Sequence, residues 1–208
     1  MTTYAYGTGR AFDVVSADFW LENTDVTVRS AQGGGQQTSG VPGAHWMGTL
    51  NYGEDYSVNR LELLGFYRKL NGKQHRIALW DLRKFSAAGV EGSPAGSINT
   101  TGVTVNATAA QFATSLELAG CGNATTLMPG DMWSVNGQLV ENAELATASA
   151  GGIMTVAVPH MLRAAASAGA AVTLIKPTAL FVLSGAFHGP RSRAMYEPFS
   201  VDIEEVFA

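Results

Sequence analysis

The sequence has few of the features that mark enzymes, membrane proteins or disulfide-rich secreted proteins. Cys121 is its single cysteine, which excludes a disulfide within the chain and a zinc site built from several thiolates. No run of about 18 apolar residues is present, so the sequence predicts no transmembrane helix. The first residues, MTTYAYGTGR, lack the basic and apolar regions of a secretory signal, and we expect no such signal.

Charged residues are also scarce, at 14% of the chain against a usual share of about 25%. Glycine, by contrast, is abundant, with 24 of 208 residues. A weakly charged surface suits a protein whose faces are covered by partners, and many glycines suit the tight turns between short strands. The net charge of −4 and the lack of a basic patch argue against nucleic-acid binding.

The basic residues are unevenly distributed along the chain. No Lys or Arg occurs in the 78 residues between Lys84 and Arg163, a part rich in Ala, Gly, Thr and Ser. Turn-forming residues stand at both ends of this part, in SAAGVEGSPAGSI and at Lys176-Pro177. We therefore expect an inserted module over residues 89–176 and an outer domain formed by residues 1–88 and 177–208.

The residue pattern predicts a mainly β protein with one helix. Glu54–Leu70 has apolar residues at helical spacing and bases near its end, and Asn71-Gly72 follows as a stop signal. The glycine-rich Ala31–Gly40 is expected to be a flexible surface loop. Pro159–Val172 is expected to hold one short turn or helix. Strands are expected at several places, among them His45–Tyr52, Met132–Gly137, ALFVLSG and the C-terminal AMYEPFSVDIEEVFA.

The stretch GKQHRIALWDL joins a histidine, two bases, a tryptophan and an aspartate. A catalytic His75–Asp81 pair would need a nucleophile such as the serine of a GxSxG motif, which the sequence lacks. Ile77 and Leu79 instead alternate with other residues at the period of two that marks a strand. We expect Ile77 and Leu79 to pack inward, and Arg76 and Asp81 to remain free for contacts between subunits.

Other tests for chemistry are negative as well. None of the four histidines stands in a metal-binding pattern, and the glycine-rich stretches lack the GxGxxG and GK[ST] signatures of nucleotide sites. We therefore expect no enzymatic activity, no catalytic or metal-binding residues and no cofactor. Trp133 allows two interpretations, a glycan-contacting aromatic side chain or, more commonly for a tryptophan on a strand, a core residue.

The order of features from about Val41 to Leu183 resembles that of distal tail or minor tail proteins of long-tailed, non-contractile bacteriophages. VPGAHWMGTL precedes a helix that ends in NG, then the strand HRIALWDL and a Gly/Pro linker. The middle part carries a GD-x-hydrophobic strand (Gly130-Asp131 with Gly137), a P-x-L-R segment (Pro159–Arg163), Gly169 as a turn and a P-x-x-x-F strand (Pro177–Phe181). Met132-Trp133 departs from the smaller β residues expected at that place.

The resemblance implies a belt-like β domain with one helix, closed by C-terminal strands, and an inserted small β-barrel or sandwich module. It implies a structural virion protein that forms a ring, hexameric in the family, between the tail tube and the baseplate hub. The implied partners are further copies of the chain, the tail tube protein, the hub protein, the tape-measure protein and a host surface glycan, with DNA only in transit. The implied location is the virion, with the host cytoplasm during assembly.

Two further expectations concern the surfaces of such a ring. Asp202, Glu204 and Glu205 are expected to face its lumen, where carboxylates would repel the phosphates of passing DNA. A carbohydrate-binding adhesion module and a tail tube or terminator protein are the alternatives to the tail-tip function, and the module without Lys or Arg argues against the tube.

Overall fold

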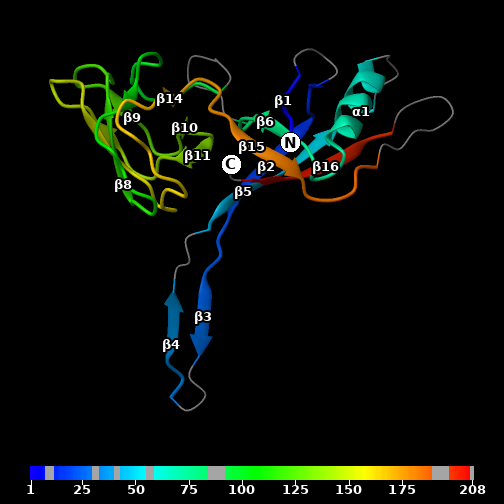
Figure 1. Ribbon diagram of the computed structural model, residues 1–208, viewed down its shortest axis with the longest axis horizontal. Coiled ribbons are helices and arrows are strands. Elements are labelled where there is room, and N and C mark those ends of the chain that lie inside the picture. The colour runs from blue at the N-terminus through cyan, green and yellow to red at the C-terminus, as the bar shows by residue number, and fades with distance from the viewer. Residues whose placement is uncertain are drawn as a thin grey trace.

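The computed structural model describes residues 1–7, 12–29, 33–39, 43–54, 59–83, 92–188 and 197–206. Within these ranges the chain is mainly β, as the sequence predicts, and holds one helix. Figure 1 shows three parts, namely a sheet covered by the helix, a compact module of short strands beside it, and a thin two-stranded ribbon that projects away from both.

The largest sheet has six strands, all antiparallel to their neighbours except for the parallel pair at one edge. Residues from both ends of the chain build it, so the C-terminal strands close the layer that the N-terminal segment begins. The order across the sheet is β1 (Thr3–Ala5), β6 (Arg76–Leu79), β15 (Ala179–Leu183), β16 (Phe199–Glu205), β5 (His45–Tyr52) and β2 (Ser16–Glu22).

Helix α1 (Asn59–Leu70) covers one face of this sheet. Its inward side buries Leu63, Tyr67 and Leu70 completely, and these side chains join the core that the sheet builds. The helix ends where the sequence predicts, because Asn71 and Gly72 both adopt positive φ, at 48° and 64°. Of the expected helical stretch, residues 55–58 lie outside the described residues.

Strand β6 settles how the stretch GKQHRIALWDL folds. Ile77 and Leu79 are completely buried, which confirms the predicted alternation. β6 lies between β1 and β15, so its backbone is paired on both sides. Residues 76–79 of the stretch are therefore an inner strand of the sheet.

The inserted module consists of three small sheets around one hydrophobic cluster that draws only on residues 98–174. The predicted strand at Met132 is present, whereas residues 159–171 form turns and bends with two isolated bridges, from Ala166 to Ala109 and from Ala171 to Thr104. No sheet of the described residues closes into a barrel. The sheets are β11 (Gln138–Glu141), β10 (Met132–Val135) and β14 (Val172–Thr173); β12 (Ala146–Thr147) and β9 (Thr126–Leu127); and β13 (Met154–Ala157), β8 (Ser115–Ala119) and β7 (Thr104–Val105).

The chain enters and leaves the module at one place. The N–H of Lys176 donates to the carbonyl of Gly92 at 2.7 Å, so the two connecting segments lie side by side. Both residues have positive φ, which marks the turns expected there. Of the predicted first linker, residues 86–91 lie outside the described residues. Met132 and Leu139 pack into the core of the large sheet, so the β10–β11 hairpin joins the two parts.

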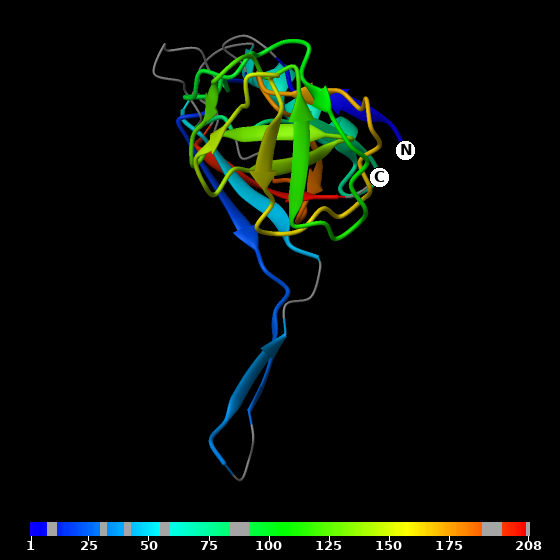
Figure 2. The same cartoon turned by 90° about the vertical axis from the view of Figure 1, so that its left-hand side faces the viewer.

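The ribbon is the part that sequence reasoning placed wrongly. β3 (Val26–Arg29) and β4 (Gln36–Ser39) form an antiparallel pair, although Ala31–Gly40 was expected to be a flexible loop. Figures 1 and 2 show this pair standing away from the sheet and the module, as an extension of β2 and β5. We call the pair β3–β4 the arm.

Candidate assembly interface

A buried ion pair holds the module against the large sheet. Arg163 of the module and Glu205 of β16 meet in a bidentate contact at 2.6 and 2.8 Å, and both side chains are almost fully buried. The Arg163 guanidinium also donates to the carbonyl of Ala44 at 2.9 Å. The backbone N–H groups of Trp46 and Leu139 donate to the Glu205 carboxylate at 2.9 and 3.4 Å. We call this network the joint.

The electrostatics of the joint follow from its burial. Burial raises the pKa of the Glu205 carboxyl, and the Arg163 charge and the two backbone N–H groups act against that rise. Burial likewise lowers the pKa of Arg163, opposed by Glu205. Burying either charge alone would cost desolvation free energy, and the bidentate contact between Arg163 and Glu205 offsets this cost. The joint therefore fixes how the module sits on the sheet.

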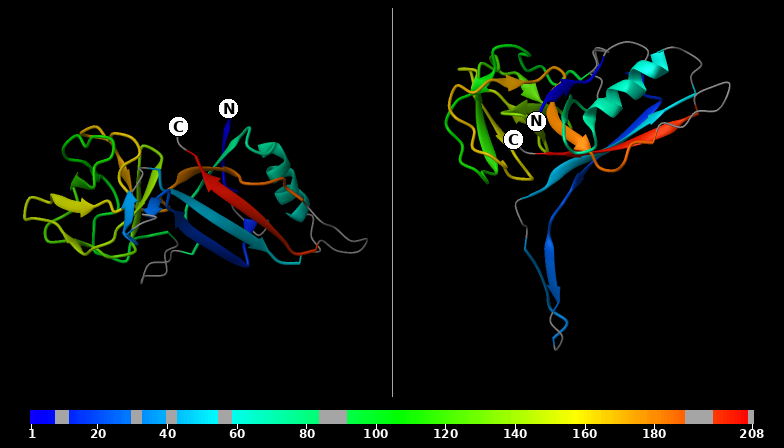
Figure 3. Two further views of the ribbon diagram at one scale, coloured as in Figure 1. Left: turned by 90° about the horizontal axis from the view of Figure 1, so that it is seen from below. Right: turned by 45° about the vertical axis from the view of Figure 1, so that its right-hand side comes forward.

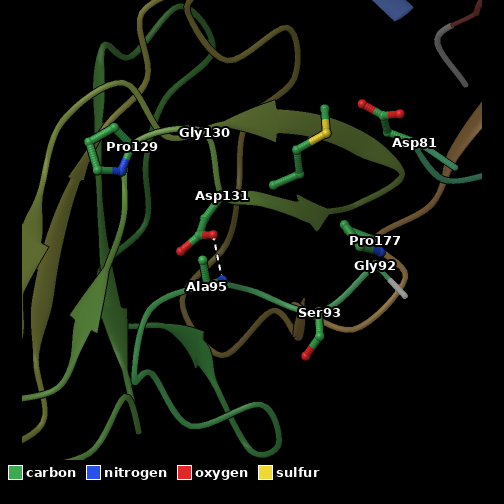
Figure 4. Close-up of a pocket in the computed structure, with 9 residues that line it drawn as sticks. Asp81, Gly92, Ser93, Ala95, Pro129, Gly130, Asp131 and Pro177 are labelled. Atoms are coloured by element: carbon green, nitrogen blue, oxygen red, sulfur yellow. Dashed lines mark hydrogen bonds between the residues drawn. The ribbon is translucent and has the colours of Figure 1, made fainter. Parts of the chain in front are cut away.

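A pocket of about 180 Å³, shown in Figure 4, is lined by Asp81 from the outer part and Asp131 from the module. Two carboxylates in one pocket raise the question of acid–base chemistry. Both, however, already have partners. Asp81 accepts two hydrogen bonds from the Arg83 side chain at 2.9 and 3.0 Å. Asp131 accepts from the backbone N–H groups of Ala95, Gly96 and Met128 at 2.7, 3.1 and 2.8 Å. These contacts hold loops in place.

A second pocket of about 290 Å³ lies between the sheet and the module, lined by Trp46, Glu141 and His160 among others. Burial, followed by the nearby Arg163 charge, lowers the pKa of His160 to about 4. The histidine is therefore neutral near pH 7, and its ring packs edge-on against Trp46 at 6.4 Å between centroids. The arrangement is that of a packed core histidine.

The arm differs from these buried sites in having no packing of its own. All of its eight residues are exposed, including Val26 at 52% and Val28 at 64%. The register places Val26 and Val28 opposite Ser39 and Gln37 on one face, while Thr27, Arg29, Gln36 and Thr38 share the other. A two-stranded ribbon alone is marginally stable in water, and none of the residues of this one is buried.

The face of the large sheet opposite α1 is also open. Seen from below in the left panel of Figure 3, strands β2, β5 and β16 lie uncovered, and the arm leaves the sheet on this side. Trp20 stands here with 41% of its surface exposed, directly opposite the half-buried Met47. Carboxylates surround these two side chains, from Asp18, Glu22, Asp202 and Glu204. We call this surface the open face.

Three of the predicted site residues prove to be buried, namely Trp133, Asp81 and Glu205. Trp133 is 0% exposed and lies in the core of the module, so the interpretation as a glycan-contacting residue is wrong and the core interpretation holds. Asp81 is 1% exposed and paired with Arg83 at 2.9 Å, so it is not free for a contact between subunits. Arg76 is half-buried on β6, and its role in assembly stays a prediction.

The three acids expected at a lumen are separated by the strand that carries them. Asp202 and Glu204 lie on the open face, where Asp202 accepts a hydrogen bond from the Thr49 hydroxyl at 2.7 Å and Glu204 pairs with Lys73 at 2.7 Å. Glu205 points to the opposite side and is buried in the joint. The expectation that Glu205 lines an aqueous channel is therefore wrong. That Asp202 and Glu204 face the lumen of a ring stays a prediction.

Sequence reasoning missed the joint and the arm, although each left a signal. Glu205 follows Val201 and Ile203 at a spacing of two, which places all three on the buried side of a strand. VTVR and QQTS are equal in length and flank a glycine-rich turn, which is the pattern of a hairpin. The polar character of QQTS hid this pattern, because neither face of the arm meets a core.

Among the described residues, no cluster of His, Cys, Asp and Glu is arranged to hold a metal ion. The helix that the structure describes is too short to span a membrane. No family model matches the chain, and no curated protein matches it.

Proposed function

We propose that this chain is a structural protein of a bacteriophage tail tip, which assembles as a ring joining the tail tube to the baseplate hub. The observation that carries the proposal is the arm, an exposed ribbon whose two valines belong to neither hydrophobic cluster of the described residues. A subunit with such an extension is incomplete by itself, because its apolar side chains and its open strand edges need a second surface.

Three other features support the same function. The order of motifs from about Val41 to Leu183 resembles that of distal tail proteins, and the mainly β architecture with one helix agrees with what this resemblance implies. The open face offers a broad surface next to the arm. Asp81 and Asp131, the two carboxylates of the pocket in Figure 4, are engaged in structural hydrogen bonds, so the geometry favours assembly over catalysis at this place.

The measurement that tests this proposal is the mass of the purified protein in solution, combined with negative-stain images of the same sample. The chain weighs 21.8 kDa. We expect closed rings of about six subunits with a central hole, since head-to-tail contacts close into rings when the rotation permits. A single species of monomer mass at every concentration would contradict the proposal. Long stacked tubes would instead favour the tail tube alternative.

The carbohydrate-binding alternative now lacks the residue on which it rested. Because Trp133 is completely buried, Trp133→Ala would remove core packing and lower the free energy of unfolding by about 3–5 kcal/mol. A glycan array with the folded wild-type protein is the direct test. Specific glycan binding together with a monomeric mass would replace the tail-tip function by adhesion.

A further inference from the structure

We propose that the pocket between the large sheet and the module binds a primary ammonium group, carried by a small amine or by a lysine side chain. This inference goes beyond the proposed function and does not depend on it. The pocket has a volume of about 290 Å³, and Leu21 and Trp46 line it from the sheet, Asn142 and His160 from the module. Figure 1 shows the β10–β11 hairpin, which precedes Asn142, on the side of the module that faces the sheet.

The side chain of Asn142 is the first sign of a ligand. Only 1% of this residue is exposed. Its amide nitrogen donates to the carbonyls of Leu127 and Met128 at 3.2 and 3.1 Å, and also to the carbonyl of Glu144. Its Oδ1 is buried too, but no described residue donates to it. A buried acceptor without a donor is destabilising, so a ligand with N–H groups would satisfy this oxygen.

His160 carries a second buried atom without a partner. The residue is 8% exposed, and no described residue forms a hydrogen bond with its Nε2. Burial, followed by the Arg163 charge, lowers the pKa of this histidine to about 4, so its ring is neutral near pH 7. A neutral imidazole accepts a hydrogen bond at Nε2 when its proton is on Nδ1. Asn142 and His160 can therefore both accept from a donor-rich ligand in the pocket that they line.

The charges around the pocket favour a cation. Glu141 lines it with a carboxylate, and none of the described residues that line it is a lysine or an arginine. Hydrogen bonds to Asp81 raise the pKa of Arg83 most, and the Glu141 charge adds a smaller rise, so Arg83 is engaged mainly by Asp81. The positive charge of Arg163 is balanced by Glu205 at 2.6 Å. A carboxylate accepts from several donors at once, so Glu141 can receive an ammonium group.

Trp46 contributes an aromatic side chain to the same pocket. Its indole N–H donates to the carbonyl of Leu139 at 3.1 Å, so this donor is already engaged within the chain. The ring that remains attracts cations, because the face of an indole is electron-rich. An aromatic ring, a carboxylate and two further acceptors are together the partners that an ammonium group requires.

Other small ligands fit these partners less well. An anion would meet the Glu141 carboxylate and two acceptors without a donor. A quaternary ammonium ion has no N–H and would leave the Oδ1 of Asn142 unsatisfied. A divalent metal ion needs several ligands, and among the residues that the structure describes no cluster of His, Cys, Asp and Glu is arranged to hold one. The three N–H groups of a primary ammonium match the carboxylate, the amide oxygen and the imidazole nitrogen.

Isothermal titration calorimetry of the purified chain near pH 7 tests this proposal. The probes are 1,4-diaminobutane, which represents a free amine, and Nα-acetyl-lysine amide, which represents a lysine side chain. We expect one saturable site per chain for at least one of them, and the tighter probe identifies the source of the ammonium group. 1,4-Butanediol, which is uncharged, and tetramethylammonium, which has no N–H, are the controls and should bind at least about tenfold more weakly.

A pair of variants and a spectroscopic measurement locate the bound amine. Glu141→Gln removes the charge from the pocket and is expected to weaken amine binding at least about tenfold. Glu144→Gln changes an exposed carboxylate that does not line the pocket and should alter binding less than about twofold. The NMR signals of the His160 ring in the wild-type chain should shift on addition of the amine, and those of His188 should not. The proposal would be overturned by the absence of saturable amine binding, by equal binding of 1,4-butanediol, by equal effects of the two variants, or by unchanged His160 signals.

Discussion

The joint and the arm differ in the burial of their side chains. At the joint, Arg163 and Glu205 are buried and share donors and acceptors from the sheet and the module. On the arm, every residue of both strands is exposed, and valines stand in water beside threonines and glutamines. The joint completes contacts within the chain, whereas the side chains of the arm stay exposed, and we propose that another subunit covers them. The buried ion pair of the joint stabilises the chain itself, and the exposed strands of the arm are the surface that we propose for contact with another subunit.

The largest effect is expected from breaking the joint at Glu205. Glu205→Ala would leave the buried Arg163 charge without its carboxylate, and we expect a loss of about 3–5 kcal/mol in the free energy of unfolding. Glu204→Ala is the matched control on the neighbouring residue, since its pair with Lys73 is exposed and worth at most about 1 kcal/mol. Urea unfolding of both variants measures the two values. Equal losses would show that the joint does not differ from a surface pair.

Acid should weaken the same region through His160. The unfolded chain binds a proton on this histidine near its ordinary pKa of about 6.5, whereas the folded chain does so only near pH 4. Between these values unfolding takes up a proton, so stability falls as the pH falls, by up to about 3 kcal/mol. His160→Gln should remove this part of the pH dependence, and His188→Gln, at an exposed position, should not. Thermal unfolding from pH 7 to pH 4 checks the difference.

The sequence predicted the parts of the fold that depend on local signals. Strand β5 has the expected bounds, the alternation of Ile77 and Leu79 in β6 is correct, and α1 ends at Asn71-Gly72. Each of these features follows from neighbouring residues, namely a period of two or a turn signal at the end of a helix.

The parts that the sequence did not predict depend on contacts across long distances in the chain. Glu205 is buried because Arg163, 42 residues earlier, reaches it, and Trp133 is buried because the module closes around it. Asp81 was expected to be free, yet Arg83 pairs with it beside the module. The surfaces that we assign to assembly were the hardest to recognise, because exposed residues leave no periodic pattern when their partner is another chain.

A smaller loss is expected at Asp131, which anchors the loop entering the module. Asp131→Ala would leave the backbone N–H groups of Ala95, Gly96 and Met128 without their acceptor, and we expect a loss of about 2–3 kcal/mol. Asp202→Ala, on the open face, serves as the control and should cost less than about 1 kcal/mol. Chemical unfolding distinguishes the two; a small effect at Asp131 would mean that water replaces the carboxylate.

The smallest effect on stability is expected from the arm itself. Val28→Asp should change the free energy of unfolding of the monomer by less than about 0.5 kcal/mol, because the side chain has no packing within the chain. The same substitution should weaken self-association at least about tenfold, because it places a carboxylate among the apolar side chains of the arm that carry the proposed assembly. Unfolding at high dilution, where the chain is monomeric, measures the first quantity. A loss of several kcal/mol would show that the arm belongs to the core of its own subunit.

Hydrogen exchange of the assembled and the diluted protein tests the division between joint and arm most directly. The account predicts that backbone amides of Val26–Arg29 and Gln36–Ser39 exchange quickly in the monomer and become protected on assembly, while amides at the joint, such as that of Trp46, are equally protected in both states. Arm amides that exchange equally fast in the assembled protein would contradict the central claim that the arm is completed by another subunit.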